Sequence, residues 1–230
     1  MEIKINERKI YVNNKDTDFH IHSNFSDGIN TIDEIVQYAS SIGLKKIAIT
    51  DHSEPWARVH EHDRRRIKTP RRTFYDRWEN VHNDVKVLKG IEIDLLDSDG
   101  GICNFMFDYE FVVLSAHEGV YKGDPRKITE AYLRAIDKHG DKIDAIGHVC
   151  ANYFAEYLDV KRVVEYANSV NIILEINGTN LNRGITMIEK LKEMVGLAER
   201  IHVNSDAHTL NEIRDSRKIG YRFLEDLTLY

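Results

Sequence analysis

Histidines and carboxylates recur along this chain just after short apolar, β-branched runs. The set comprises His20, His22, Asp27, His52, Glu92, His117, His148, Asp206 and His208. In a parallel α/β fold the carboxyl ends of the strands lie at one rim, so side chains that follow the strands converge there. The pattern therefore predicts an α/β fold with a site for several metal ions at one end.

Apolar runs alternate with stretches of helical periodicity. Seven runs rich in Ile and Val predict strands at 17–21, 46–50, 87–95, 111–115, 145–149, 172–176 and 201–204. Amphipathic stretches predict helices at 31–43, 73–84, 125–138, 159–168, 185–195 and 210–220. This succession indicates parallel strands joined by right-handed crossovers. Because ligand-type residues end six of the seven runs, a closed barrel is favoured over an open doubly wound sheet.

The composition is that of a single globular domain spanning residues 1–230. Hydrophobic residues make up 42% of the chain and charged residues 30%, and a chain of this length buries enough apolar surface to fold without disulfides or metals. Cys103 and Cys150 show no CxxC spacing, which suits a reducing compartment. No signal peptide or membrane span is visible, so the cytoplasm is the expected location and no membrane partner is expected.

Two segments stand apart from the alternating pattern. Residues 1–15 form an N-terminal extension that could add an edge strand, and residues 53–77 form a basic insertion close to the expected site. The segment from Arg58 to Arg77 contains eight basic and three acidic residues, so its local charge is +5 (8 − 3), although the whole chain has a net charge of −6. The insertion either steers an anionic substrate to the site or is a solvated charge run. No nucleic-acid recognition motif accompanies it, so nucleic acid is a less favoured partner.

The dyads His20-x-His22 and Asp206-x-His208 have the spacing of a ligand pair on a strand. Residues i and i+2 point to the same face, with side chains about 6–7 Å apart, so both members can address one ion. A single dyad is more often a hydrogen-bonded pair than a metal site. Two dyads at matching strand ends favour the metal site.

Glu92 interrupts an otherwise apolar strand, and His117 and His148 follow apolar runs in the same way. A carboxylate in such a position has to be paired, protonated or bound to a cation, because an isolated buried charge is costly. The alternatives are a buried Glu paired with Lys or Arg and two core histidines. Their occurrence together favours the metal site.

Six motifs, in order, resemble those of the PHP (polymerase and histidinol phosphatase) family. They are His20-Ile-His22-Ser-Asn-Phe-Ser-Asp27-Gly, Thr50-Asp-His52, Gly90-Ile-Glu92, Ser115-Ala-His117, Gly147-His148 and Ser205-Asp206-Ala-His208. The resemblance spans about residues 16–210 and is closest to histidinol-phosphatase-type members. It implies a distorted, seven-stranded (β/α)7 TIM-like barrel with the metal site at the C-terminal ends of the strands.

The resemblance also implies how two or three divalent ions would be held. The first ion would take His20, His22, Glu92 and Asp206. Glu92 would bridge to a second ion held by His117 and His148, and a third would take Asp27, His52 and His208. Some family members carry His at the position of Asp27. Ligands of this kind suit Zn²⁺, Mn²⁺ or Fe²⁺ without choosing among them.

The expected chemistry is hydrolysis of a phosphoester. A metal-bridging hydroxide would attack phosphorus while the ions neutralise charge on the phosphoryl oxygens, with Glu92, His117 and Asp206 as the catalytic residues around it. Arg183 and Asn177 belong to a segment similar to one in histidinol-phosphatase-type members, where a basic residue would clamp the phosphoryl group. Arg58, in the basic insertion, is the third predicted substrate-binding residue. A solvated loop arginine is the alternative for Arg183.

Three functions are compatible with these residues. The leading hypothesis is a phosphatase acting on a small phosphate monoester, with L-histidinol phosphate as the favoured substrate. The second is a phosphodiesterase or nuclease of the same family, which would use the basic insertion along a chain of phosphates. The third is a non-catalytic metal-binding module. The complete ligand set speaks against the third, and the oligomeric state stays open.

Overall fold

A single, mostly parallel sheet forms the centre of the computed structural model, which describes residues 1–5, 8–60, 84–105 and 108–228. The strands in these ranges are β1 (Glu2–Ile5), β2 (Arg8–Val12), β3 (Thr17–Ile21), β4 (Lys46–Ile49), β5 (Lys86–Asp94), β6 (Phe111–Ser115), β7 (Ala145–Ile146), β8 (Ile173–Asn177) and β9 (Arg200–Asn204). Their order is β1-β2-β9-β8-β7-β6-β5-β4-β3. All neighbours are parallel except the β1–β2 hairpin.

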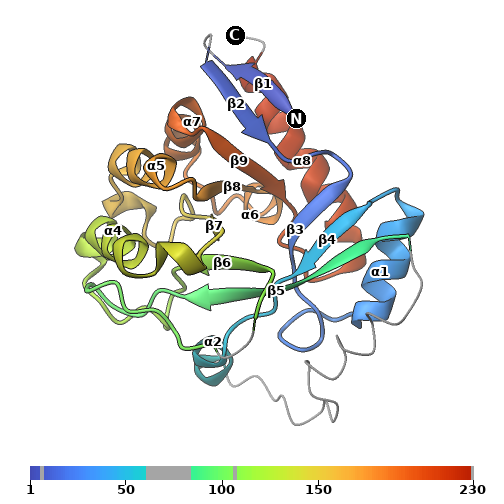
Figure 1. Ribbon diagram of the computed structural model, residues 1–230, viewed down its shortest axis with the longest axis horizontal. Coiled ribbons are helices and arrows are strands. Elements are labelled where there is room, and N and C mark those ends of the chain that lie inside the picture. The colour runs from blue at the N-terminus through green and yellow to red at the C-terminus, as the bar shows by residue number, and fades with distance from the viewer. Residues whose placement is uncertain (6–7, 61–83, 106–107, 229–230) are drawn as a thin grey trace.

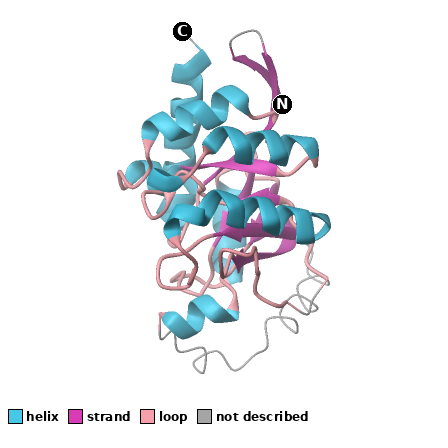
Figure 2. Ribbon diagram, turned by 90° about the vertical axis from the view of Figure 1, so that its left-hand side faces the viewer, coloured by secondary structure: helices cyan, strands magenta, loops and turns pink. Residues whose placement is uncertain are grey.

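Helices lie outside the curved sheet (Figure 1). Those in the described ranges are α1 (Ile32–Ser41), α2 (Glu54–Val59), α4 (Ile128–His139), α5 (Val160–Ser169), α6 (Gly178–Asn182), α7 (Ile188–Leu197) and α8 (Leu210–Thr228), with short 3₁₀ turns at Pro125–Lys127, Gly140–Lys142 and Ala155–Tyr157. Helices α4, α5 and α7 lie side by side over one face (Figure 2). The sheet's apolar residues and these helices form the largest core cluster.

Local sequence signals explain where the helices begin. Thr31 and Glu34 form a capping box at the start of α1, in which the side chain of each accepts from the backbone N–H of the other. Asp159 caps α5 by accepting from the N–H of Arg162. Helix α1 begins just beyond the loop that follows β3 and holds Asp27. Helix α5 begins beyond the segment that follows β7 and holds His148.

Strand β9 has two partners along its outer edge. Its first residues pair with β2, and the Asn13 side chain then continues the pairing: its Oδ1 accepts from the N–H of Val203 (2.8 Å), and its Nδ2 donates to the Val203 carbonyl (3.2 Å). The Asn204 side chain in turn accepts from the N–H of Phe19 in β3 (3.0 Å). Side-chain amides thus replace backbone hydrogen bonds where the chain passes from β2 to β3.

Backbone hydrogen bonds join β3 to the segment after β9 at the carboxyl ends of the two strands. The N–H of Asp206 donates to the His20 carbonyl (2.9 Å), and the N–H of His22 donates to the Ala207 carbonyl (2.9 Å). An isolated parallel bridge joins Ile21 to Ala207. These contacts bring the segments after β3 and β9 together, and the site residues lie at this junction.

The prediction of an α/β fold with a parallel sheet is confirmed, and each of the seven predicted runs contains a strand, although the described residues form more strands than the seven predicted. The extension at residues 1–15 contributes β1 and β2, so nine strands form the sheet. The run predicted as a strand at 145–149 pairs only over Ala145–Ile146, because His148 adopts a positive φ of 26° that ends the extended backbone.

Some predicted segments lie outside the described ranges, and two observed helices were not predicted. All but the last residue of the helix predicted at 73–84, and most of the basic insertion, residues 61–77, fall outside the described residues. Helices α2 and α6 were not predicted; both are short, and α6 directly follows β8. No helix in the described ranges is long and apolar enough to cross a membrane.

The inner face of the sheet has one titratable ring in its aromatic packing. His202 stacks on Phe19 (centroids 4.7 Å apart) and on Phe111 (5.8 Å). Burial lowers its pKa from 6.5 to about 4. Between these pH values the unfolded chain binds a proton at this ring that the folded chain does not, so stability falls as the pH drops through the window.

The substitution His202→Phe should flatten this part of the pH dependence, because a phenyl ring keeps the stacking and does not titrate. The difference in unfolding free energy between variant and wild type should change by up to about 3 kcal/mol between pH 7 and pH 4, since one pKa unit corresponds to about 1.4 kcal/mol. Urea denaturation of both proteins in the presence of a chelator measures this. Parallel pH profiles for the two proteins would contradict the assignment.

Candidate metal centre

The Glu92 carboxylate, on β5, lies at the centre of the candidate site and is almost completely buried. Five imidazoles surround it. The nitrogen–oxygen distances are 2.7 Å to His52, 2.9 Å to His148, 3.3 Å to His117, 3.5 Å to His20 and 3.5 Å to His22. These histidines come from the ends of four different strands, so the predicted convergence at one rim is what the structure shows.

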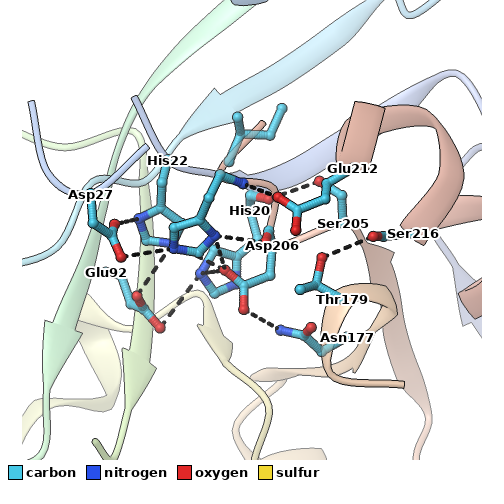
Figure 3. Close-up of polar contacts among 12 residues, drawn as sticks. His20, His22, Asp27, Glu92, Asn177, Thr179, Ser205, Asp206, Glu212 and Ser216 are labelled. Atoms are coloured by element: carbon cyan, nitrogen blue, oxygen red, sulfur yellow. Dashed lines mark hydrogen bonds and ion pairs between the residues drawn. The ribbon is translucent and has the colours of Figure 1, made fainter. Parts of the chain in front are cut away.

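The dyad on β3 has the geometry that its spacing predicts. His20 and His22 point to the same side, with ring centroids 5.2 Å apart, and Asp206 faces both from the segment after β9 (Figure 3). The Asp206 Oδ1 atom lies 3.2 Å from Nε2 of His22 and 3.6 Å from Nε2 of His20. Glu92 completes a group in which two imidazoles and two carboxylates face one point.

A second group forms around Asp27, in the loop after β3. The Asp27 carboxylate lies 3.0 Å from Nε2 of His208, 3.7 Å from Nδ1 of His22 and 3.7 Å from Nε2 of His52. All four residues present donor atoms within the reach of one ion. The structure therefore brings Asp27 to the other predicted ligands.

The described residues form three donor groups, and these groups share more residues with one another than the predicted ligand sets do. They are His20, His22 and Glu92; His52, Glu92 and His117; and His22, Asp27, His52 and His208. His52 faces Glu92 with Nδ1 and Asp27 with Nε2, so it lies between two groups, whereas the prediction placed it in the third alone. His148 approaches Glu92 most closely after His52. All nine predicted ligands lie in one continuous cluster.

The donor atoms fit a divalent cation. Nε2 of His20, Nε2 of His22 and Oδ1 of Asp27 are buried and have no hydrogen-bond partner among the described residues. Buried polar atoms are almost always satisfied, so atoms left without partners and aimed at one point indicate a missing ligand. Imidazole nitrogens and carboxylate oxygens without thiolate are the ligands of Zn²⁺, Mn²⁺ and Fe²⁺.

The electrostatics of the cluster are consistent with cation binding. Burial alone would raise the pKa of Glu92, but the imidazoles of His117, His52 and His20 hold it well below its usual range. Burial would lower the pKa of His117, but Glu92 and Asp94 raise it to about 10. Protons on His117 and His20, whose pKa values are raised, balance the buried carboxylates when no cation is present, whereas burial lowers the pKa of His52 to about 3. Binding of a cation would therefore release protons.

Buried carboxylates behind the donor residues hold them in place, and the sequence analysis missed them. Glu175 accepts from Nδ1 of His20 (2.8 Å), from the N–H of His148 (2.9 Å) and from Nδ2 of Asn177 (3.1 Å). A partner of this kind fixes the tautomer and orientation of an imidazole ligand. The signal was present in the sequence, because Glu175 interrupts an apolar strand just as Glu92 does.

Two aspartates perform the same task elsewhere in the cluster. Asp94 accepts from Nδ1 of His117 (2.7 Å) and from the Ser53 hydroxyl. Asp51 accepts from the hydroxyls of Ser23 (2.7 Å) and Ser26 (2.6 Å), which holds the loop between His22 and Asp27. Both aspartates lie next to predicted ligand motifs, at Glu92-x-Asp94 and Asp51-His52.

The backbone at two donor residues adopts an unusual conformation. His148 has φ = 26° and Asp206 has φ = 52°, a left-handed region that costs about 1–3 kcal/mol for residues other than glycine. Beside His148, Gly147 leaves no room for a side chain: an added Cβ would overlap Ser115 Oγ and lie 2.8 Å from Val113 Cγ1. Such conformations concentrate at functional sites, where surrounding contacts hold them.

A cavity of about 260 Å³ opens onto the donor cluster. Its lining includes seven of the nine predicted ligands and, from the loops around them, Trp56, His60, Glu118, Tyr153, Thr179, Asn180, Arg183 and Ile185. The bottom of the cavity is thus the donor cluster and its wall is built from loops after β4, β6, β7 and β8.

The three predicted substrate-binding residues differ in their positions. Arg183 lines the cavity and pairs with Glu212 (3.0 Å). Asn177 is buried beside Asp206, and its amide donates to Asp206 (2.9 Å) and Glu175 (3.1 Å), so it orients donor residues. Arg58 is absent from the described lining and pairs with Glu54 (2.6 Å) on the surface of α2.

Comparison with known proteins assigns the chain to a family. The PHP domain family model matches residues 18–196, which include seven of the nine donor residues and most of the sheet. The chain belongs to the PHP domain family.

Relatives in this family include enzymes of two kinds. The chain is 26% identical over 207 residues to the DNA polymerase/3'-5' exonuclease PolX of Bacillus subtilis, covering 88% of this chain but 36% of PolX. It is 29% identical over 213 residues to a probable phosphatase of Clostridium novyi, covering 88% of this chain and 82% of the relative. A probable phosphatase of Clostridium acetobutylicum is 27% identical, and the match spans 65% of its length.

Solved structures show the same fold. A histidinol phosphate phosphatase from Lactococcus lactis, complexed with zinc, L-histidinol and phosphate, superposes with a TM-score of 0.57 at 17% identity, covering 90% of this chain and 93% of that one. A histidinol phosphatase homologue from Listeria monocytogenes gives a TM-score of 0.54 at 14% identity, covering 86% and 97%. The similarity extends over nearly the whole chain.

The substitution Glu175→Gln should weaken metal binding about 10- to 100-fold, the usual effect of removing a partner that orients a ligand. The amide keeps the shape of the side chain but no longer offers a carboxylate to Nδ1 of His20. Competition with a chromogenic chelator, using Zn²⁺ and Mn²⁺ separately, measures the affinity.

Glu165→Gln is the matched control, since Glu165 is exposed on α5. Equal affinity in the Glu175 and Glu165 variants would show that Glu175 has no orienting role.

Proposed function

We propose that this chain is a metal-dependent phosphoesterase that hydrolyses a small phosphate monoester, with L-histidinol phosphate as the favoured substrate. The observation that carries the proposal is the cluster of nine imidazole and carboxylate donors at the bottom of one cavity, with unpartnered buried atoms aimed inward. An isolated buried charge is costly, and this cluster holds several. Cations that also bind a phosphoryl group explain the whole arrangement.

The dimensions of the cavity and the relatives support a small monoester. A volume of about 260 Å³ lies just below the range of about 300–1,000 Å³ typical of small-molecule pockets. Several relatives are named probable phosphatases, and a structural neighbour carries zinc, L-histidinol and phosphate. These similarities support phosphoester hydrolysis more strongly than they support L-histidinol phosphate as the substrate.

Each donor group would hold one ion. His20, His22, Asp206 and Glu92 form one site, His117 and His148 with Glu92 a second, and Asp27, His52 and His208 a third, with His52 close enough to serve the second as well. Bound cations of this kind lower the pKa of water and neutralise charge on phosphoryl oxygens.

The chain's own residues would bind and orient the substrate. Arg183 reaches the cavity from the end of α6 and presents a guanidinium, whose planar donors suit a phosphoryl group. Its partner Glu212 also accepts from the N–H of His208. Glu212 therefore ties the arginine to the loop that carries two donor residues, and the catalytic residues proposed around the phosphorus are Glu92, His117 and Asp206.

A phosphodiesterase or nuclease is the second candidate, and the similarity to PolX favours it. It would require a polynucleotide to reach the donor cluster, and the residues of the basic insertion beyond His60 lie outside the described ranges. A panel of phosphomonoesters and phosphodiesters, run with metal analysis of the purified protein, separates the two activities. Metal-loaded protein without activity on either class would indicate a non-catalytic metal-binding module.

The substitution Glu92→Gln should abolish phosphatase activity and reduce metal content together. A single carboxylate faces five imidazoles, so its loss affects more than one ion, and we expect at least a 100-fold fall in kcat/KM, comparable to removing a major electrostatic contributor. Elemental analysis and steady-state kinetics on the same preparation give both quantities. Near-normal activity in this variant would refute the proposed centre.

The substitution Arg183→Ala should raise KM and lower kcat/KM by about 10- to 100-fold, the range for a lost charged hydrogen bond of about 1.5–3 kcal/mol. Metal content should not change, because Arg183 contacts Glu212 and no donor atom of the cluster. The same kinetics and elemental analysis test it.

Arg162→Ala is the matched control, because Arg162 also makes one ion pair, with Glu130 (2.7 Å), and lies on α5 away from the cavity. Loss of metal in the Arg183 variant, or equal effects in the two variants, would contradict a substrate-binding role.

A further inference from the structure

An aromatic column leads from the donor cluster to the cavity wall. His52, Trp56 and His60 follow one another at intervals of four residues, a spacing that places side chains on one face of a helix. The Trp56 indole stacks on the His52 ring at 3.8 Å with an interplanar angle of 8°, and on the His60 ring at 4.2 Å and 22°. All three rings line the cavity.

Trp56 gives this column a fixed position. The indole is buried and packs against Ala57, Val120 and Leu96 in a small apolar cluster. His60 lies on the outer face of the indole and is exposed to solvent. The Trp56 indole thus lies between His60 and the candidate ligand His52. The exposed His60 ring remains in contact with water.

A hydrogen bond determines which nitrogen of His60 can carry out chemistry. Nδ1 lies 3.0 Å from the Trp56 carbonyl. A carbonyl only accepts, so Nδ1 has to carry a hydrogen, and Nε2 is the nitrogen left to contact a substrate. The ring has the arrangement of a general acid–base histidine, in which one nitrogen is anchored and the other is free to react.

We propose that His60 is the general acid of the reaction, which protonates the ester oxygen as it leaves phosphorus. This role rests on the proposed function. In the step, the oxygen of a water molecule forms a bond to phosphorus, and the bond from phosphorus to the ester oxygen breaks. The proton on Nε2 of His60 goes to that oxygen, so the alcohol departs neutral. The proton lost by the attacking water passes to solvent, from which His60 is protonated again.

Arg183, Tyr153 and the histidines of the donor cluster suit this task less well. Arg183 keeps its proton at all relevant pH values. Burial raises the pKa of the Tyr153 hydroxyl above its ordinary value of 10, which makes it a weaker acid near neutral pH. His117 and His208 face the carboxylates of Glu92 and Asp27 as part of the donor cluster. His60 is the lining imidazole that is outside this cluster among the described residues.

The test compares two esters that differ in their need for a proton. An alkyl phosphate releases a strongly basic alkoxide, whereas p-nitrophenyl phosphate releases a stable phenolate that departs without protonation. In the metal-loaded His60→Gln variant, kcat/KM for L-histidinol phosphate, or for the best alkyl phosphate in the panel, should fall about 10²- to 10⁴-fold. Activity on p-nitrophenyl phosphate should fall only a few-fold, and metal content should stay at the wild-type level.

His139→Gln is the control, since His139 ends α4 and does not line this cavity; both of its activities should equal those of the wild type. Equal losses on the two esters in the His60 variant would overturn the acid role, because they would indicate binding or positioning. Loss of metal, or no loss of activity, would overturn it as well. If loaded wild-type protein hydrolyses neither ester, the proposed function itself fails and this role with it.

Discussion

The burial of the Glu92 carboxylate among five imidazoles is the constraint on which the rest of the site depends. A carboxylate in that position is stable only if positive charge is close on all sides, supplied by protonated histidines or by cations. The histidines that supply it come from the ends of β3, β4, β6 and β7. The strands therefore have to bring their carboxyl ends to one point, and the parallel order of the sheet achieves this.

The donor residues keep their positions because a second set of buried polar groups holds them from behind. Glu175 connects His20, His148 and Asn177, and Asn177 passes the connection on to Asp206. Through these bonds, residues from β3, β7, β8 and the segment after β9 become one hydrogen-bonded unit. The unit also accounts for the left-handed backbone at His148 and Asp206, since the hydrogen bonds to Glu175 and Asn177 offset part of the strain.

The sequence predicted the parallel α/β fold and the nine donor residues because both leave short-range signals. Apolar runs mark the strands, and a polar residue directly after a run, such as His117, marks the rim. The β1–β2 hairpin was harder to foresee, since it pairs with β9, about 190 residues away, partly through the Asn13 side chain. Glu175 carried the same signal as Glu92 and was missed because it lies one layer behind the rim. The sequence also could not predict which donor residues would share an ion. His52 faces Asp27 with one ring nitrogen and Glu92 with the other, and this depends on the position of its ring in the folded chain.

The two halves of the cavity differ in how strongly the fold determines them. The bottom is made of side chains at strand ends, where backbone hydrogen bonds and buried carboxylates limit movement to small adjustments. The wall is made of loop and short-helix residues, such as Trp56, Tyr153 and Arg183, which lie several residues beyond the strand ends. Under the proposed function, the reaction class would depend on the bottom of the cavity and the alcohol part of the substrate on its wall. The residues of the wall are therefore where the specificity of the proposed phosphatase has to be sought.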